Sequence, residues 1–104
     1  AFIHMERVSS PDDLVIITDF FLKMVEASWC IVSGVYGKNL IVILRYAGFR
    51  LDAGKAAKKL FGPWGNSGGH KEAARAEIPL QALEKDVKGE SALRKFIWER
   101  IEIL

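Results

Sequence analysis

Hydrophobic and polar residues are spaced differently along successive stretches of the chain, and each change of spacing predicts a separate element. Residues 2–8 carry only a weak strand signal, which is equally typical of a linker. Residues 11–26 place polar side chains on one stripe and leave a wide apolar face, as expected for an amphipathic helix. Ser10 and Pro11 precede two aspartates at its start, and these residue types favour a helix N-terminus.

The next two apolar runs, residues 29–36 and 40–46, are rich in β-branched and aromatic side chains. A glycine-containing tripeptide, residues 37–39, separates them and favours an antiparallel hairpin. The second run is apolar at nearly every position, so we expect a central strand that is covered on both faces. Arg45 interrupts this run near its end, where a charged group needs either a partner or an open cleft.

The second half of the chain predicts short helices around a glycine-rich connection. Asp52 is placed to cap a helix over residues 53–61, and Gly62-Pro63 ends it. Four of the nine residues 62–70 are glycines, which predicts a loop that leads into a third helix. The remaining expected elements are that short helix at 70–76, an edge strand at 77–79, a short helix at 80–87 and a closing helix at 91–104. Together these elements predict one small α/β domain in which helices flank a mixed sheet with a central hairpin.

The length and composition are compatible with a single domain over residues 1–104. The chain has 104 residues, half of them hydrophobic, which is enough for one independent core. A single cysteine excludes a disulfide framework and a cysteine-based zinc site. The longest aliphatic run, residues 40–44, is far shorter than the ~20 residues that span a bilayer. There is no basic-then-apolar leader, so we expect a cytoplasmic protein without a membrane partner.

The net charge of +2 is unevenly distributed along the chain. Residues 38–75 contain eight basic and two acidic side chains, a balance of +6, whereas the rest of the chain carries −4. Such a basic segment predicts an anionic partner. Lys55, Lys58 and Lys59 fit an ordinary solvated helix face equally well, so these lysines do not decide between the two interpretations.

The glycine-rich stretch before His70 is the strongest candidate for a binding site. Glycines allow backbone N–H groups to approach a ligand closely, and a helix start adds free N–H donors and the positive end of a dipole. His70 and Lys71 supply further donors, and the guanidinium of Arg45 can bind two oxygens of one anion. The pattern is neither a P-loop nor a dinucleotide-binding fingerprint. The alternative interpretation is a tight connection with a packed or capping histidine.

The residues from Gly68 to Ala74, followed by Glu77-Ile78, resemble the signature of the DHH-associated domain, which is the C-terminal domain of DHH phosphoesterases. The family pattern is three glycines and a histidine, a short gap, and then Ala-Ala-Gly. The strand Leu40–Arg45, which ends in an arginine 25 residues before the histidine, resembles a second element of the family. The resemblance extends over most of the chain, from Pro11 to Leu80.

The resemblance implies which residues bind the substrate. In this family the C-terminal domain closes over the substrate and holds it with the glycine-rich loop, the histidine and the strand-end arginine. Ser67 stands where the family has its first glycine, and Arg75 replaces the glycine of Ala-Ala-Gly, which leaves the preferred substrate open. With the donors named above, the expected substrate- or phosphate-binding residues are Arg45, Ser67, Gly68, Gly69, His70 and Lys71, with Trp64, Asn66 and Arg75 at the rim.

The resemblance also implies that the catalytic chemistry lies outside this chain. DHH phosphoesterases carry Asp and His ligands for manganese in an N-terminal domain, and they act on short oligonucleotides, nucleotide phosphates, cyclic dinucleotides or polyphosphate. This chain has no Asp-His-His triplet, and its only other histidine is His4. We therefore expect no catalytic residue and no bound cofactor here. The expected partners are an anionic substrate and the manganese-binding DHH domain of the same protein.

Two other functions stay open at the level of the sequence. A nucleic-acid-binding module without catalytic activity would stack bases on aromatic side chains, for which Trp29, Tyr36, Tyr46 and Trp64 are the candidates. A regulatory domain that binds a nucleotide or a small anion is the third hypothesis. The effect of ligand length separates the first two, because a strand-binding module gains affinity with length and shows a steep salt dependence.

Overall fold

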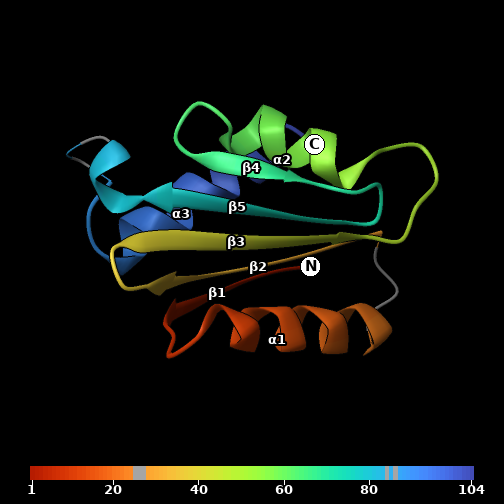
Figure 1. The fold of residues 1–104 in the computed structure, drawn as a ribbon, viewed down its shortest axis with the longest axis horizontal. Coiled ribbons are helices and arrows are strands. Elements are labelled where there is room, and N and C mark those ends of the chain that lie inside the picture. The colour runs from red at the N-terminus through yellow and green to blue at the C-terminus, as the bar shows by residue number, and fades with distance from the viewer. Residues whose placement is uncertain (25–27, 84, 86) are drawn as a thin grey trace.

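The computed structural model shows one α/β domain built on a five-stranded mixed sheet, as the sequence predicts (Figure 1). It describes residues 1–24, 28–83, 85 and 87–104. The elements are β1 (Phe2–Arg7), α1 (Pro11–Met24), β2 (Trp29–Tyr36), β3 (Asn39–Tyr46), α2 (Ala53–Phe61), β4 (Asn66–Gly69), β5 (Ala73–Pro79), a 3₁₀ turn (Leu80–Ala82) and α3 (Glu90–Ile101). The strand order is β1-β2-β3-β5-β4, in which β1 is parallel to β2 and all other neighbours are antiparallel. One face of the sheet packs against α1, and the other packs against α2 and α3.

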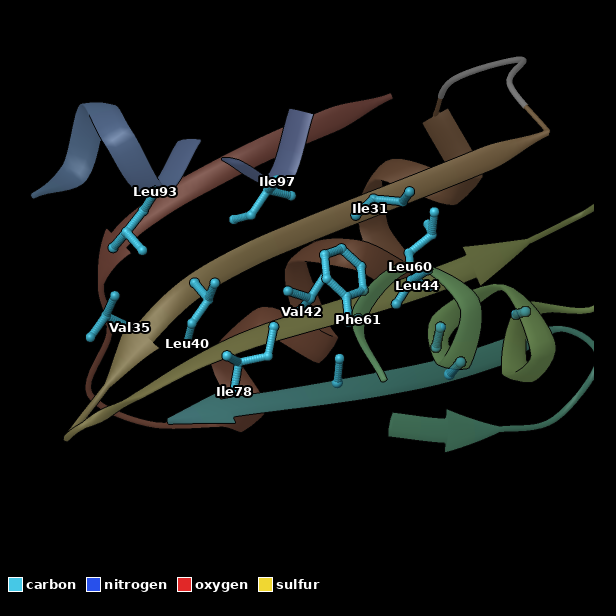
Figure 2. Packing of buried hydrophobic residues seen from close by; sticks show 14 of the residues in the cluster. Ile31, Val35, Leu40, Val42, Leu44, Leu60, Phe61, Ile78, Leu93 and Ile97 are labelled. Atoms are coloured by element: carbon cyan, nitrogen blue, oxygen red, sulfur yellow. The ribbon is translucent and has the colours of Figure 1, made fainter. Parts of the chain in front are cut away.

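The predicted hairpin of β2 and β3 forms the centre of the sheet, and β3 is buried on both faces from Leu40 to Leu44. This arrangement confirms the central strand that the apolar run predicts. The larger core cluster lies between the sheet and the pair α2 and α3, and Figure 2 shows among its members Ile31, Val42, Leu44, Phe61 and Ile97. The smaller cluster lies under α1 and consists of Leu14, Cys30, Val32, Ile41 and Ile43, with partly buried residues around it.

Helix α2 begins at the predicted position, and its first N–H groups are all bound by the protein. The side chain of Asp52 accepts a hydrogen bond of 3.0 Å from the N–H of Lys55, which confirms the predicted cap. The carbonyls of Lys71 and His70 accept hydrogen bonds, both 2.8 Å long, from the first two N–H groups of the helix. The turn between β4 and β5 is therefore fastened to the N-terminus of α2, which satisfies the free donors of a helix start.

The helix predicted over residues 70–76 is wrong, because this segment is the turn of a β-hairpin and the first part of its second strand, β5. The glycine-rich residues 66–69 form the edge strand β4, which pairs antiparallel with β5. In β5, Ala74, Ala76 and Ile78 are buried while the residues between them are half-buried, which is the period of a strand. Burial of these small apolar side chains under α2 outweighs the helix propensity of alanine. The predicted strand at 77–79 is real but is the end of β5, which lies between β3 and β4 rather than at the edge.

The remaining differences concern the ends of elements. The structure describes α1 to Met24, and the last two residues predicted for this helix lie outside the described residues. The predicted helix at 80–87 is reduced to the 3₁₀ turn Leu80–Ala82, and residues 84 and 86 are not described. The closing helix is α3, in which Leu93 and Ile97 are buried as expected.

Strand β1 is joined to its neighbours by a nearly buried histidine. The Nδ1 atom of His4 lies 2.7 Å from the hydroxyl of Ser33 on β2, and its Nε2 atom lies 2.6 Å from a carboxylate oxygen of Glu90 at the start of α3. The side chain of His4 is 3% exposed, and Ser33 is fully buried. His4 and Ser33 thus each have a hydrogen-bond partner, and the contacts connect β1, β2 and α3.

Candidate anion-binding site

Strands β4 and β5 present one face that none of the described helices covers, because α1 packs on β2 and β3 at the other half of the sheet (Figure 1). The buried residues of β5 point toward α2, so Ala73, Arg75 and Glu77 point the opposite way. Arg45 of β3 shares their face, because it stands directly opposite Ala73 in the ladder. We call these four residues the open face. It carries two arginines, which makes it the candidate for binding an anion.

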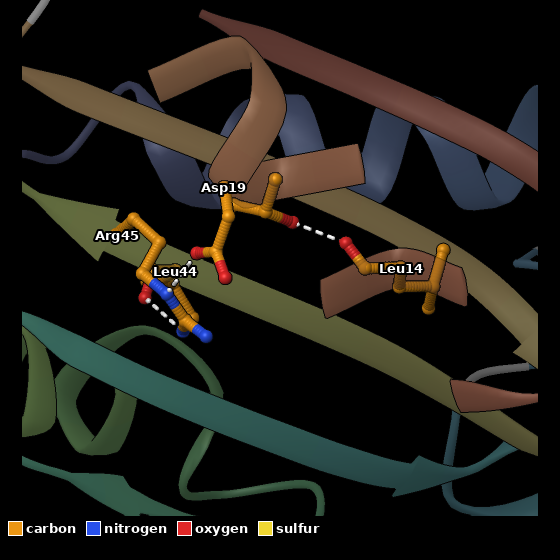
Figure 3. A network of polar contacts seen from close by, with 5 residues as sticks. Leu14, Asp19, Leu44 and Arg45 are labelled. Carbon is orange, nitrogen blue, oxygen red and sulfur yellow. Dashed lines mark hydrogen bonds and ion pairs between the residues drawn. The ribbon is translucent and has the colours of Figure 1, made fainter. Parts of the chain in front are cut away.

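The guanidinium of Arg45 lies at the border between the open face and α1. Its Nε atom donates a hydrogen bond of 2.9 Å to Oδ1 of Asp19 on α1, and Nη1 is 3.3 Å from the carbonyl of Leu44 (Figure 3). The Arg45 side chain is 19% exposed and that of Asp19 is 51% exposed. Arg45 therefore has the partner that a charge at the end of an apolar strand requires, but this carboxylate is itself open to solvent and can be displaced.

The second arginine, Arg75, forms an ion pair with Glu77 two residues further along β5. Both side chains are about two-fifths exposed. Its Nε atom is buried and finds no hydrogen-bond partner among the described residues. The exposed part of the guanidinium, rather than this buried nitrogen, is what can donate to an oxyanion. Its location at the rim of a binding site stays a prediction.

The structure brings Arg45 and His70 to the same end of the sheet. Arg45 stands opposite Ala73 on β5, and the carbonyl of Ala73 accepts a hydrogen bond of 2.7 Å from the N–H of His70. The two residues are thus separated by one strand, so their backbones lie roughly 10 Å apart at the usual strand spacing. His70 is exposed and Arg45 is part-buried. Two long side chains at this separation can contact a single phosphate between them.

The electrostatic environment of His70 differs from the expectation. His70 does not stand at a helix start but in the turn between β4 and β5, whose carbonyls already bind the first two N–H groups of α2. Its backbone is fixed at both ends, because its carbonyl accepts from α2 and its N–H donates to β5. Lys71 is exposed in the same turn. The turn presents the side chains of His70, Lys71 and Glu72 to solvent.

The other expected site residues are divided between the two faces of the sheet. Ser67 is opposite Ala76 in the ladder and lies beside α2, so its hydroxyl points away from the open face. Asn66 is exposed and stands opposite Glu77 at the far end of β4. Trp64 packs edge-to-face on Phe96 of α3, with ring centroids 5.1 Å apart. Its location at the rim of a site stays a prediction, and the observed contact is the one expected of a tryptophan that holds this segment onto the fold.

The aromatic residues proposed for base stacking are mostly engaged within the fold. Trp29 and Tyr46 pack on one another with centroids 4.5 Å apart, and Tyr46 is buried. The guanidinium of Arg100 lies over the ring of Trp64 at 5.0 Å. Tyr36 is 44% exposed at the end of β2, which leaves it the most accessible of the four.

The described residues offer neither a metal-binding set nor an accessible nucleophilic thiol. No three His, Cys, Asp or Glu side chains among them come together as ligands. Cys30 is buried under α1, and this burial raises the pKa of its thiol, which keeps the sulfur protonated at neutral pH. Among the described residues, every helix is too short or too polar to cross a bilayer.

Comparison with known sequences gives one informative relative. No protein-family model matches this chain. An uncharacterized protein of Methanocaldococcus jannaschii is 37% identical to it over 101 residues, and the alignment covers 97% of this chain but 20% of the relative. The chain thus spans about a fifth of the length of the curated relative that it matches.

Comparison with solved structures shows where else this fold occurs. The C-Ala domain of alanyl-tRNA synthetase from Aquifex aeolicus superposes with a TM-score of 0.65 at 14% identity, covering 93% of this chain and 86% of that domain. Two structures of RecJ from Thermus thermophilus superpose at 20% identity, with TM-scores of 0.59 for the Mn²⁺ complex and 0.62 for the Mg²⁺ complex. They cover 98% of this chain but only 13% and 14% of RecJ. The fold therefore matches most of the C-Ala domain and a small part of RecJ.

Proposed function

We propose that this chain is the substrate-binding, DHH-associated domain of a manganese-dependent phosphoesterase that acts on short oligonucleotides, nucleotide phosphates or polyphosphate. The observation that carries the proposal is the common location of Arg45 and His70, which lie one strand apart at the same end of the sheet. Two of the residues that resemble the family motif, Arg45 and His70, are thus near one another. The RecJ likeness supports the fold that the proposal requires, and the longer relative supports a chain that works as part of a larger protein.

In this function the domain binds and positions a phosphate group, and the metal-dependent step takes place on the other domain. Arg45 and Arg75 neutralise the charge of the phosphate, and His70 donates from the opposite side of β5. The glycines of β4 leave this edge without side chains, so a ligand can approach the backbone closely. Manganese, held by the N-terminal domain, would activate the attacking water. The described residues of this chain contribute no ligand set to such a metal.

The test is to measure by calorimetry how tightly a short 5′-phosphorylated oligonucleotide binds to the 104-residue chain. Arg45→Ala and His70→Ala are each expected to weaken binding roughly ten- to hundredfold, because each removes one charge-assisted hydrogen bond worth about 1.5–3 kcal/mol. The double variant should lose less than the sum, since both residues contact one phosphate. The same oligonucleotide without its terminal phosphate should bind weakly to all variants.

The control for Arg45 is its carboxylate partner. Asp19→Asn removes the ion pair but retains the arginine, so it is expected to bind the phosphate at least as tightly as the wild type. Arg94→Ala on the exposed surface of α3 should change nothing. Unchanged affinity in Arg45→Ala or in His70→Ala would show that Arg45 and His70 do not share a ligand. Strictly additive losses in the double variant would show the same. An equal loss in Asp19→Asn and Arg45→Ala would assign Arg45 a structural role alone.

A further inference from the structure

A second surface with the character of a binding site lies on the other side of the sheet, between the β3–α2 connection and α2. It is a groove of about 400 Å³, and its apolar lining includes Phe49, Leu51 and Ala56. Phe49 is 91% exposed and Leu51 is 47% exposed. Ile103 and Leu104 in the same lining are also exposed, and a contiguous apolar patch, unlike a single exposed side chain, is typical of an interaction surface. No function considered so far uses this groove.

The connection that carries Phe49 is ordered by a specific set of contacts. The hydroxyl of Tyr46 accepts hydrogen bonds of 3.3 Å from the N–H groups of both Arg50 and Leu51. Gly48 passes so close to this hydroxyl that a Cβ atom there would overlap it. Since the backbone folds around Tyr46, the side chain of Phe49 is turned outward. A ring held exposed by an ordered backbone is pre-organised to bind, because little conformational entropy is lost on contact.

The groove is bordered by cations that are free to bind an anion. Arg50, Lys55, Lys59 and Lys71 contribute four positive charges to its lining. None of them forms an ion pair with a described residue. Asp52, the acidic side chain among the described lining residues, is already bound to the N-terminus of α2. The groove thus combines an apolar floor with a positive border, which disfavours a second copy of this chain as the occupant because like charges would meet.

We propose that this groove binds single-stranded nucleic acid, with a nucleobase stacked on Phe49 and the neighbouring phosphates contacted by Arg50, Lys55 and Lys59. Only an unpaired base exposes the face that a phenylalanine ring can cover, and phosphates flank each base at a distance that long cationic side chains reach. The proposal goes beyond the function above, because the groove lies on the α2 side of the sheet and the open face lies on the α1 side. If Arg45 proves not to bind a terminal phosphate, binding of a single strand in the groove can therefore still be tested.

The test is fluorescence anisotropy of a labelled ten-residue oligothymidylate that lacks a 5′-phosphate, titrated with the 104-residue chain. Phe49→Ala is expected to weaken binding about tenfold, whereas Phe49→Trp should retain the affinity of the wild type. Phe20→Ala, which removes an exposed phenylalanine from α1, is the matched control and should have no effect. The double variant Lys55→Gln/Lys59→Gln should reduce the slope of log K against log salt by roughly 0.7 for each lysine removed. Lys95→Gln on α3 is the control for this charge effect.

Several results would overturn the proposal. Equal affinity of the wild type and Phe49→Ala, or equal losses in Phe49→Ala and Phe20→Ala, would show that Phe49 does not stack on a base. Preference for duplex DNA over the single strand would exclude base stacking as the mode of binding. Sedimentation that shows a dimer in the wild type and a monomer in Phe49→Ala, with no oligonucleotide bound, would assign the groove to self-association instead.

Discussion

Replacement of Phe61 by alanine is expected to lower the free energy of unfolding by about 3–5 kcal/mol, the usual cost of removing a buried phenylalanine. Phe61 is the last residue of α2 and has no exposed surface. Figure 2 shows its ring in the centre of the larger core cluster, between α2 and the sheet. A domain of this size has a total stability of roughly 5–15 kcal/mol, so this one substitution removes a large share of it.

Urea denaturation followed by circular dichroism measures this effect, and Phe49→Ala is the matched control. The ring of Phe49 is 91% exposed, so its removal should change the free energy of unfolding by less than about 0.5 kcal/mol. The melting temperature of Phe61→Ala should fall by at least roughly 12 °C. Similar stabilities of the two variants would mean that α2 does not pack on the sheet as described.

The two neighbouring glycines of β4 are expected to respond differently to the same substitution. Gly69 has a φ of +151°, and a Cβ atom there would lie 2.5 Å from Cα of Ala74 on the adjacent strand. Gly69→Ala should therefore cost about 2–4 kcal/mol of stability through strain and overlap. A Cβ atom on Gly68 would meet only Cε of Lys58, at an ordinary 3.6 Å. Gly68→Ala is thus expected to leave the free energy of unfolding nearly unchanged.

This difference separates the structural role of the glycine pair from its proposed binding role. If the edge of β4 must stay free of side chains for a phosphate to approach, Gly68→Ala will fold normally and still bind the 5′-phosphorylated oligonucleotide more weakly. Thermal melting and calorimetry on the same samples give both quantities. Normal stability together with normal affinity would show that Gly68 is not part of the phosphate site, whereas a large loss of stability would contradict the contacts described for β4.

The sequence predicts the centre of the fold well because the signals there are local. The two apolar runs and the tripeptide between them specify the hairpin of β2 and β3, and Asp52 specifies the start of α2. The length of the apolar run also predicts correctly that β3 is covered on both faces. In each case the residues that decide the structure are neighbours in the chain.

The segment from His70 to Ala76 shows why the rest could not be predicted. Its alanines and charged residues have the local preferences of a helix, but their conformation depends on pairing with β3 and on burial under α2. Those partners lie far away in the sequence, and strand formation depends more on such neighbours than on intrinsic preference. The alternation of Ala74, Ala76 and Ile78 with larger polar residues was the available signal.

In the candidate site, too, features set by the local sequence are predictable and features set by contacts between distant residues are not. Arg45 stands out in the sequence as a charge at the end of an apolar strand, and its need for a partner is predictable. Asp19 as that partner is not predictable, because only the packing of α1 on β3 brings it within 2.9 Å. Phe49 carries no signal of function in the sequence, since its exposure depends on how the backbone folds around Tyr46.

The bonds between the β4–β5 turn and the first N–H groups of α2 give the domain a route for communication between its two sides. A ligand that shifts His70 must either move the start of α2 with it or break two hydrogen bonds there. Helix α2 also carries Lys55 and Lys59 of the groove, so a shift at the turn would change how those lysines are presented. Thermodynamic linkage would then be reciprocal: a strand bound in the groove would alter the affinity for a phosphate on the open face by the same factor.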